Sequence, residues 1–271
     1  MRLCYHRPWM LSRHRRWPFH LFYERMYTND LKAQGASAKA FKYTADTNII
    51  VPCLSSPTIS DQLALQQELS HYEKEARHKH MSINKSKTKI IRFNLRGNLN
   101  CPCKQDGSYE TVANSKVLGI HFDSNCYFDT HGKHLIGNLK RVLYVIKDLQ
   151  LDRFRSQDID RVFDALVLSR VRYGISVYGS DWRTIKKVDT FLTKCFQKGY
   201  TSKLQTAEAL LQTEDKRLLK NILSNPLHPL LPFLTSCTTT NKNTRQKFTQ
   251  LRQLTRTKVF ANSFCNRVRP F

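Results

Sequence analysis

The sequence predicts an α+β fold, in which a small antiparallel sheet with a helix on its back is followed by an all-helical region. Two observations lead to this prediction. In the first half, short segments rich in β-branched and aromatic residues surround a single helical segment. From about residue 130 onward, apolar residues recur at the three- and four-residue spacing of helices that bury one face. The pattern changes near residue 129, where we place the main domain boundary.

Strand and helix signals alternate in the first half of the chain. Residues 41–51 (FKYTADTNIIV) are predicted as strand, turn and strand, and residues 88–94 as a further strand. Between them, residues 58–80 are predicted as a helix with one apolar stripe: Leu65, Leu69, Tyr72 and Ala76. Residues 111–128 are predicted as a hairpin that turns at 123–125. Its expected core is Val117, Leu118, Ile120 and Phe122.

Four helices are predicted in the second half, at about 132–150, 156–178, 182–198 and 206–224. The apolar face of the first consists of Leu135, Leu139, Val142, Ile146 and Leu149. In the third, the residues expected to point inward are Trp182, Ile185, Val188, Leu192 and Cys195. The predicted organisation is therefore a basic arm at 1–20, a mixed region at 21–129, a helical region at 130–234 and a basic tail at 235–271.

The charge of the chain indicates a polyanionic partner. Lys and Arg total 45 against 21 Asp and Glu, a formal net charge of +24. This excess costs self-repulsion in a compact fold unless a polyanion neutralises it, and nucleic acid is the commonest such partner. We therefore expect RNA, DNA or an RNA–DNA hybrid as the partner. The alternative is a basic surface that serves only solubility.

Three lysines form a row on the first helix of the second half. Lys133, Lys140 and Lys147 recur every seven residues, on nearly the opposite face from the apolar stripe. Such a row is either a solvated face or a set of phosphate contacts. The high net charge makes these lysines candidates for contacts with a nucleic-acid backbone.

Cysteine usage and hydropathy bear on the compartment. The eight cysteines are scattered, and the close pair Cys101 and Cys103 has no second pair at zinc-site spacing. Free thiols are typical of a reducing compartment, so an intracellular location in the nucleus or cytoplasm is expected. No apolar run reaches the roughly 18 residues of a membrane span, so no membrane partner is expected.

Several short motifs follow one another along the chain. Residues 41–47 read FKYTADT, residues 81–88 read MSINKSKT and residues 116–120 read KVLGI. The flanking motifs are WPFHLF at 17–22, NDL at 29–31, SRVRYGI at 169–175 and NPLHPL at 225–230. In order and spacing these segments resemble the reverse transcriptases of non-LTR retrotransposons of the LINE and jockey type. The resemblance covers roughly residues 17 to 268.

This resemblance implies a partial palm at 21–129 and a thumb-like region at 130–234. The family's activity is RNA-directed DNA polymerase, a nucleotidyltransferase reaction in which two divalent metals, here Mg²⁺, are held by carboxylates. Segment 41–47 resembles the family hairpin K-[YF]-A-D-D-T. Ala45 stands in place of a metal-binding Asp, and only Asp46 keeps its carboxylate. The family's upstream Asp should precede the residues present here, so we expect an incomplete Mg²⁺ site and no polymerase activity.

Two further motif positions take family roles through the resemblance. Lys87 matches the motif lysine that approaches the incoming phosphates, and the alternative is one basic residue in a basic loop. Leu118 and Gly119 match the hairpin that grips the primer end, where Gly permits close approach of a backbone. The leading hypothesis is a truncated, inactive reverse-transcriptase domain that retains nucleic-acid binding. The alternatives are a non-enzymatic basic helical RNA/DNA-binding module, an enzyme completed by another chain, and a product that does not fold stably.

Overall fold

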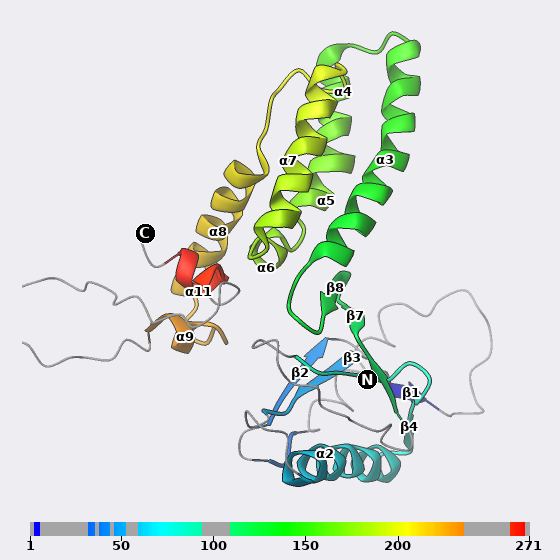
Figure 1. Ribbon diagram of the computed structural model, residues 1–271, viewed down its shortest axis with the longest axis vertical. Coiled ribbons are helices and arrows are strands. Elements are labelled where there is room, and N and C mark those ends of the chain that lie inside the picture. The colour runs from blue at the N-terminus through cyan, green and yellow to red at the C-terminus, as the bar shows by residue number, and fades with distance from the viewer. Residues whose placement is uncertain are drawn as a thin grey trace, which may run out of the picture. The chain divides into compact units, whose positions relative to one another are not determined.

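A computed structural model of the chain describes residues 3–5, 32–35, 38–43, 46–52, 59–93, 109–235 and 261–268. Its helices and small sheets confirm the α+β class (Figure 1). The chain forms two compact units. Unit 1 contains Met1–Arg92 and Asn98–Ala113, and unit 2 contains Phe93–Gly97 and Asn114–Phe271. The segment from residue 114 to residue 128 thus belongs to the unit that contains the later helices. The chain finally passes from unit 1 to unit 2 between residues 113 and 114, before the boundary that the sequence predicts near residue 129.

Unit 1 packs one helix against short strands. Strands β2 (Lys39–Tyr43) and β3 (Asp46–Ile50) form an antiparallel hairpin, as the sequence predicts. Helix α2 (Ile59–His78) matches the predicted helix, and Tyr72 and Ala76 of its apolar stripe are buried with Met81. The other strands are β1 (Leu3–Tyr5), β4 (Met81–Ile83), β5 (Lys89–Ile91) and β6 (Glu110–Val112).

The sheets of unit 1 differ from the single antiparallel sheet that was expected. Each sheet in the described residues has two strands: β1 pairs with β4, β2 with β3, and β5 with β6. The β5–β6 pair is parallel. A parallel pair requires a long connection, and the one between β5 and β6 runs from residue 92 to residue 109. The antiparallel prediction is therefore wrong for this pair.

Unit 2 begins with a tight hairpin. Strands β7 (Asn114–Val117) and β8 (Ile120–Asp123) are antiparallel, with Val117 opposite Ile120. The turn is therefore Leu118-Gly119, and the prediction that the hairpin turns at 123–125 is wrong. That later segment forms a separate turn, in which the Cys126 N–H donates to the Asp123 carbonyl at 2.8 Å, and it leads into the first helix of the unit.

The other elements of unit 2 in the described residues are helices. Helices α3 (Asp129–Leu151), α7 (Trp182–Gln197) and α8 (Ala207–Ser224) match predicted helices. The helix predicted at 156–178 is interrupted. It comprises α4 (Ser156–Phe163), the π-helical segment η1 (Asp164–Leu168), α5 (Ser169–Arg172) and α6 (Ile175–Tyr178). The break before α6 lies at Gly174, whose φ of 69° is left-handed and cannot belong to a right-handed helix.

Two short helices come last among the described residues of unit 2. They are α9 (Leu231–Thr235) and α11 (Phe264–Arg267). Arg267 of α11 anchors to α8, because its guanidinium pairs with the Asp215 carboxylate at 2.8 Å. None of the helices in the described part of the chain is long and apolar enough to cross a membrane.

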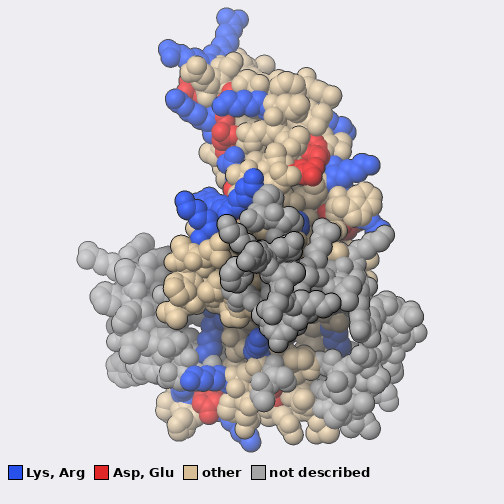
Figure 2. Space-filling model, turned by 90° about the vertical axis from the view of Figure 1, so that its left-hand side faces the viewer, with Lys and Arg blue, Asp and Glu red and all other residues tan. Residues whose placement is uncertain are grey.

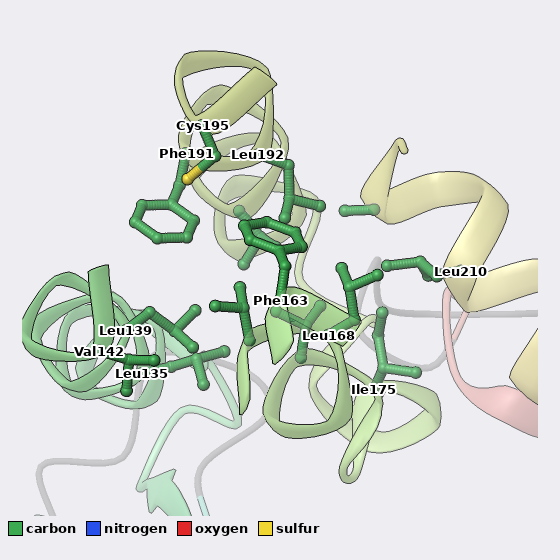
Figure 3. Packing of buried hydrophobic residues seen from close by; sticks show 14 of the residues in the cluster. Leu135, Leu139, Val142, Phe163, Leu168, Ile175, Phe191, Leu192, Cys195 and Leu210 are labelled. Carbon is green, nitrogen blue, oxygen red and sulfur yellow. The ribbon is translucent and has the colours of Figure 1, made fainter. Parts of the chain in front are cut away.

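The core of unit 2 lies between α3, the interrupted segment from α4 to α6, α7 and α8 (Figure 3). It includes Leu135, Leu139, Val142, Phe163, Leu168, Ile175, Phe191, Leu192, Cys195 and Leu210. The predicted apolar face of α3 is confirmed at Leu135, Leu139, Val142 and Ile146, whereas Leu149 is only partly buried. Each large apolar side chain buried there stabilises the fold by about 1.5–3 kcal/mol. Trp182 was expected to point inward, but its side chain is 61% exposed. The inward assignment of Trp182 is therefore wrong.

Candidate nucleic-acid interface

The hairpin that carries Asp46 has the predicted form. Asp46 begins β3 and lies opposite Tyr43, whereas Thr44 and Ala45 lie outside the described residues. In the described part of the chain, no group of three or more His, Cys, Asp or Glu side chains could hold a metal ion. A two-metal centre needs several oxygen ligands at close quarters. The described residues therefore do not fit a Mg²⁺ centre around Asp46.

Lys87 lies in the turn between β4 and β5, which Asn84 organises. The Asn84 side-chain oxygen accepts hydrogen bonds from the Ser86 hydroxyl at 2.7 Å and the Lys87 N–H at 3.1 Å. The Asn84 backbone carbonyl accepts a hydrogen bond from the Thr88 hydroxyl at 2.9 Å. The Asn and Thr of this motif thus shape the turn, and the Lys87 side chain is exposed on unit 1.

The Leu118-Gly119 turn is held by the helix break that precedes α6. The Tyr173 hydroxyl donates a hydrogen bond to the Leu118 carbonyl oxygen at 2.6 Å. The Tyr173 ring also covers Gly119, where an added Cβ would lie 3.2 Å from Cε1. Beside it, a Cβ on Gly174 would clash with Ile120 Cδ1. The motifs at 116–120 and 169–175 therefore form one structure.

Leu118 is strained at the tip of this hairpin. Leu118 has a φ of 47° and Gly119 a φ of 87°, the type I′ geometry that suits the twist of two short strands. A left-handed conformation costs a residue such as Leu about 1–2 kcal/mol. The Leu118 side chain is nevertheless 44% exposed and so gains little from burial. Strain that the surroundings impose is typical of functional sites, and here the strained residue is exposed at the tip of the hairpin.

The predicted lysine row lies on the exposed side of α3. Lys133, Lys140 and Lys147 are all exposed, and successive members are about 10.5 Å apart along the helix axis. Lys133 differs from the other two, because its ammonium pairs with Asp129 at 2.8 Å. Among the described residues, Lys140 and Lys147 form no ion pair. Of the three candidate phosphate contacts, these two lysines are therefore the more available.

Asp129 also joins α3 to α7. Its carboxylate forms an ion pair with Lys187 of α7 as well as with Lys133. The hydrogen bonds from Lys133 and Lys187 lower the pKa of Asp129 to about 2. Two cations against one carboxylate leave this junction positive. The sequence predicts the lysine row on α3. It does not indicate that Lys187 of α7 lies beside this row, since Asp129 and Lys187 are 58 residues apart.

Basic side chains continue over other parts of the chain. Figure 2 shows Lys and Arg side chains standing out from the helical unit, with fewer Asp and Glu between them. Residues 236–271 carry eight Lys and Arg and no Asp or Glu. The charge is therefore spread widely, and particular contacts must be assigned by substitution rather than by charge alone.

The family resemblance depends on motifs that the fold brings into defined places. Segments 116–120 and 169–175 meet in unit 2, and segment 81–88 forms the turn between β4 and β5. Tyr173, which the motif contains but which was given no role from the sequence, makes the central contact. The chain matches no protein-family model, no curated protein and no solved structure.

Proposed function

We propose that this chain contains part of a non-LTR reverse-transcriptase domain, binds RNA, DNA or an RNA–DNA hybrid and does not polymerise. Unit 1 would then be a remnant of the palm, and unit 2 would contain the grip hairpin and the thumb-like helices. The observation that carries the proposal is the hydrogen bond from Tyr173 to Leu118, since it joins two motif segments that lie far apart in the sequence.

Binding would rest on phosphate contacts from exposed lysines. Each phosphate that a protein neutralises releases counterions, and log affinity falls with log salt by about 0.9 per phosphate on duplex DNA. Contacts to the backbone carry no direct sequence information. We therefore expect hybrid binding that depends strongly on salt and weakly on sequence.

A pair of double variants tests the surface of α3. Lys140→Gln with Lys147→Gln removes two charges from α3, and Lys216→Gln with Lys220→Gln removes two from exposed positions on α8. Helix α7 contacts both helices and lies between them (Figure 1). We expect the α3 variant to reduce the salt slope of hybrid binding by about 2 and the α8 variant to change it less. Equal losses from both variants would contradict a specific role for α3.

The proposal also excludes catalysis by this chain. Loss of a metal ligand costs several kcal/mol of transition-state stabilisation, and about 1.36 kcal/mol is a tenfold change in rate. The purified chain should not extend a primer on an RNA template in the presence of Mg²⁺. Metal-dependent extension that Asp46→Asn abolishes would refute this part of the proposal.

A second candidate is a non-enzymatic basic helical module that binds RNA or DNA without a grip hairpin. It is favoured by the large core of unit 2, which packs the helices together. The two candidates differ at the strained tip. If the hairpin contacts the backbone, Leu118→Asn weakens hybrid binding, whereas a purely helical module keeps its affinity.

A further inference from the structure

An exposed tryptophan borders a basic groove at the start of α7. Trp182 lines a shallow groove of about 400 Å³ together with Arg183, Lys186, Lys187 and Thr190. Its indole ring is largely open to solvent. The groove therefore combines an aromatic face with three cationic side chains.

A second aromatic ring contacts one of the residues that line the groove. Tyr127, just before α3, is partly exposed, and the Arg183 Cζ lies 5.6 Å from the centroid of its ring. That distance is within the range of a cation–π interaction. Arg183 therefore contacts Tyr127 while also lining the groove beside Trp182.

A buried carboxylate joins the two backbone segments that carry these aromatic residues. Asp181 is 5% exposed and accepts hydrogen bonds from the Thr184 hydroxyl at 2.9 Å and the Arg183 N–H at 3.1 Å. It also accepts the Phe128 N–H at 3.3 Å. Asp181 thus ties the segment of Tyr127 to the first turn of α7. A site that is rigid before binding loses less conformational entropy when a ligand arrives.

The charges of the groove select an anion. Lys187 is paired with Asp129, but Arg183 and Lys186 form no ion pair within the described residues. An acidic peptide would pair with these cations but would leave the aromatic rings without a contact. A duplex would offer phosphates, but its bases are stacked in its interior and cannot stack on Trp182. A single strand of nucleic acid offers phosphates and unstacked bases together, and aromatic side chains are the usual platforms for such bases.

We propose that this groove binds a single-stranded stretch of nucleic acid, with a base stacked on Trp182 and phosphates at Arg183 and Lys186. The inference rests on the proposed function, because it adds a single-strand site to a protein that binds a hybrid duplex. Stacking makes the site tolerant of sequence, since every base has an aromatic face.

Fluorescence anisotropy with the full chain tests the groove. The probes are a short labelled oligo(dT) and a blunt RNA–DNA hybrid of the same length. Trp182→Ala should weaken oligo(dT) binding about 5- to 150-fold, the range of one base–aromatic stack, and should leave hybrid affinity unchanged. The matched control is Tyr144→Ala, which removes an exposed aromatic ring from α3 instead. It should change the affinity for neither probe.

Several outcomes would overturn the inference. Trp182→Ala without effect on oligo(dT), or with the same effect on both probes, contradicts a stacking site while leaving hybrid binding and the proposed function intact. Equally tight, Trp182-dependent binding of a poly-glutamate peptide or of anionic lipid vesicles would assign the groove to another ligand. Binding of neither nucleic-acid probe by the unaltered chain would overturn both the inference and the proposed function.

Discussion

Tyr173 and Leu118 are joined by a hydrogen bond of 2.6 Å from the tyrosine hydroxyl to the leucine carbonyl oxygen. Leu118 is the first residue of a hairpin turn, and Tyr173 lies at the break between α5 and α6. The left-handed backbone at Leu118 costs about 1–2 kcal/mol. The hydrogen bond from Tyr173 holds the turn in this conformation. Residues of two separate sequence motifs therefore stabilise the same turn.

Removing this hydrogen bond should loosen the hairpin tip. Tyr173→Phe keeps the ring over Gly119 but deletes the donor, so we expect the free energy of unfolding to fall by about 0.5–1 kcal/mol. Urea denaturation followed by circular dichroism measures the change. Tyr144→Phe, on an exposed ring of α3, should have no effect. Unchanged stability in Tyr173→Phe would show that the hydrogen bond does not hold the turn.

The two turn residues should respond in opposite ways to substitution. Gly119→Ala places a Cβ against Tyr173 at positive φ and should destabilise the protein by about 1–2 kcal/mol. Leu118→Asn should keep or raise stability, because Asn tolerates the left-handed region better than Leu.

Binding to a hybrid separates stability from function at Leu118. If the exposed leucine contacts the nucleic acid, Leu118→Asn weakens binding although the fold is no less stable. Stability from urea denaturation and affinity from anisotropy are measured on the same preparation. Loss of both together would indicate that Leu118 acts only through folding.

Acid should weaken unit 2 through a buried histidine. His131 is 6% exposed, and its ring centroid lies 4.9 Å from that of Tyr178. Within the described residues, its two ring nitrogens have no hydrogen-bond partner. Burial, and next the nearby His121, lower the pKa of His131 from 6.5 to about 4. Between these values the unfolded chain binds the proton and the folded chain does not. The contribution to stability is therefore complete above pH 6.5 and is lost as the pH falls towards 4.

This linkage gives a measurable pH dependence. We expect roughly 2 kcal/mol of unfolding free energy to be lost between pH 7 and pH 4.5 through His131. Urea denaturation at the two pH values compares the unaltered chain with His131→Leu, which should lose less, and with His78→Gln at an exposed position of α2 as control. An identical pH dependence in His131→Leu would rule out this histidine as the source.

Asp129 should act against nucleic-acid binding. Its carboxylate pairs with Lys133 and Lys187, so Asp129→Asn frees both cations. We expect tighter binding of the hybrid at low salt, and a smaller difference at high salt because screening weakens exposed charges. Glu208→Gln on α8 makes the same change in net charge at another exposed position. An equal gain in affinity from Glu208→Gln would show that the effect comes from the net charge of the chain and not from the position of Asp129.

The sequence predicts the parts of this fold that local periodicity determines. The apolar spacing of α3, α7 and α8 marks helices that bury one face, and their bounds lie close to those expected. The strand pairing of β2 with β3 follows from two short β-rich runs around a polar centre.

The errors arise where distant residues decide the local structure. Turn chemistry favours 123–125 over Leu118-Gly119, but Tyr173 stabilises the latter from another part of the chain. Periodicity alone continues the helix through Gly174, but this residue has a left-handed φ and lies against Ile120. Trp182 fits the apolar stripe of α7, yet it is the first residue of the helix and projects beyond the core.

The most direct measurement of the central claim is the affinity of the full chain for a labelled RNA–DNA hybrid across a range of salt concentrations. The account predicts that log affinity falls linearly with log salt, with a slope of about −3 or steeper if the three lysines of the α3 row each meet a phosphate. Absence of binding at low salt, or aggregation in place of a defined complex, would contradict it and leave the basic charge without a nucleic-acid partner.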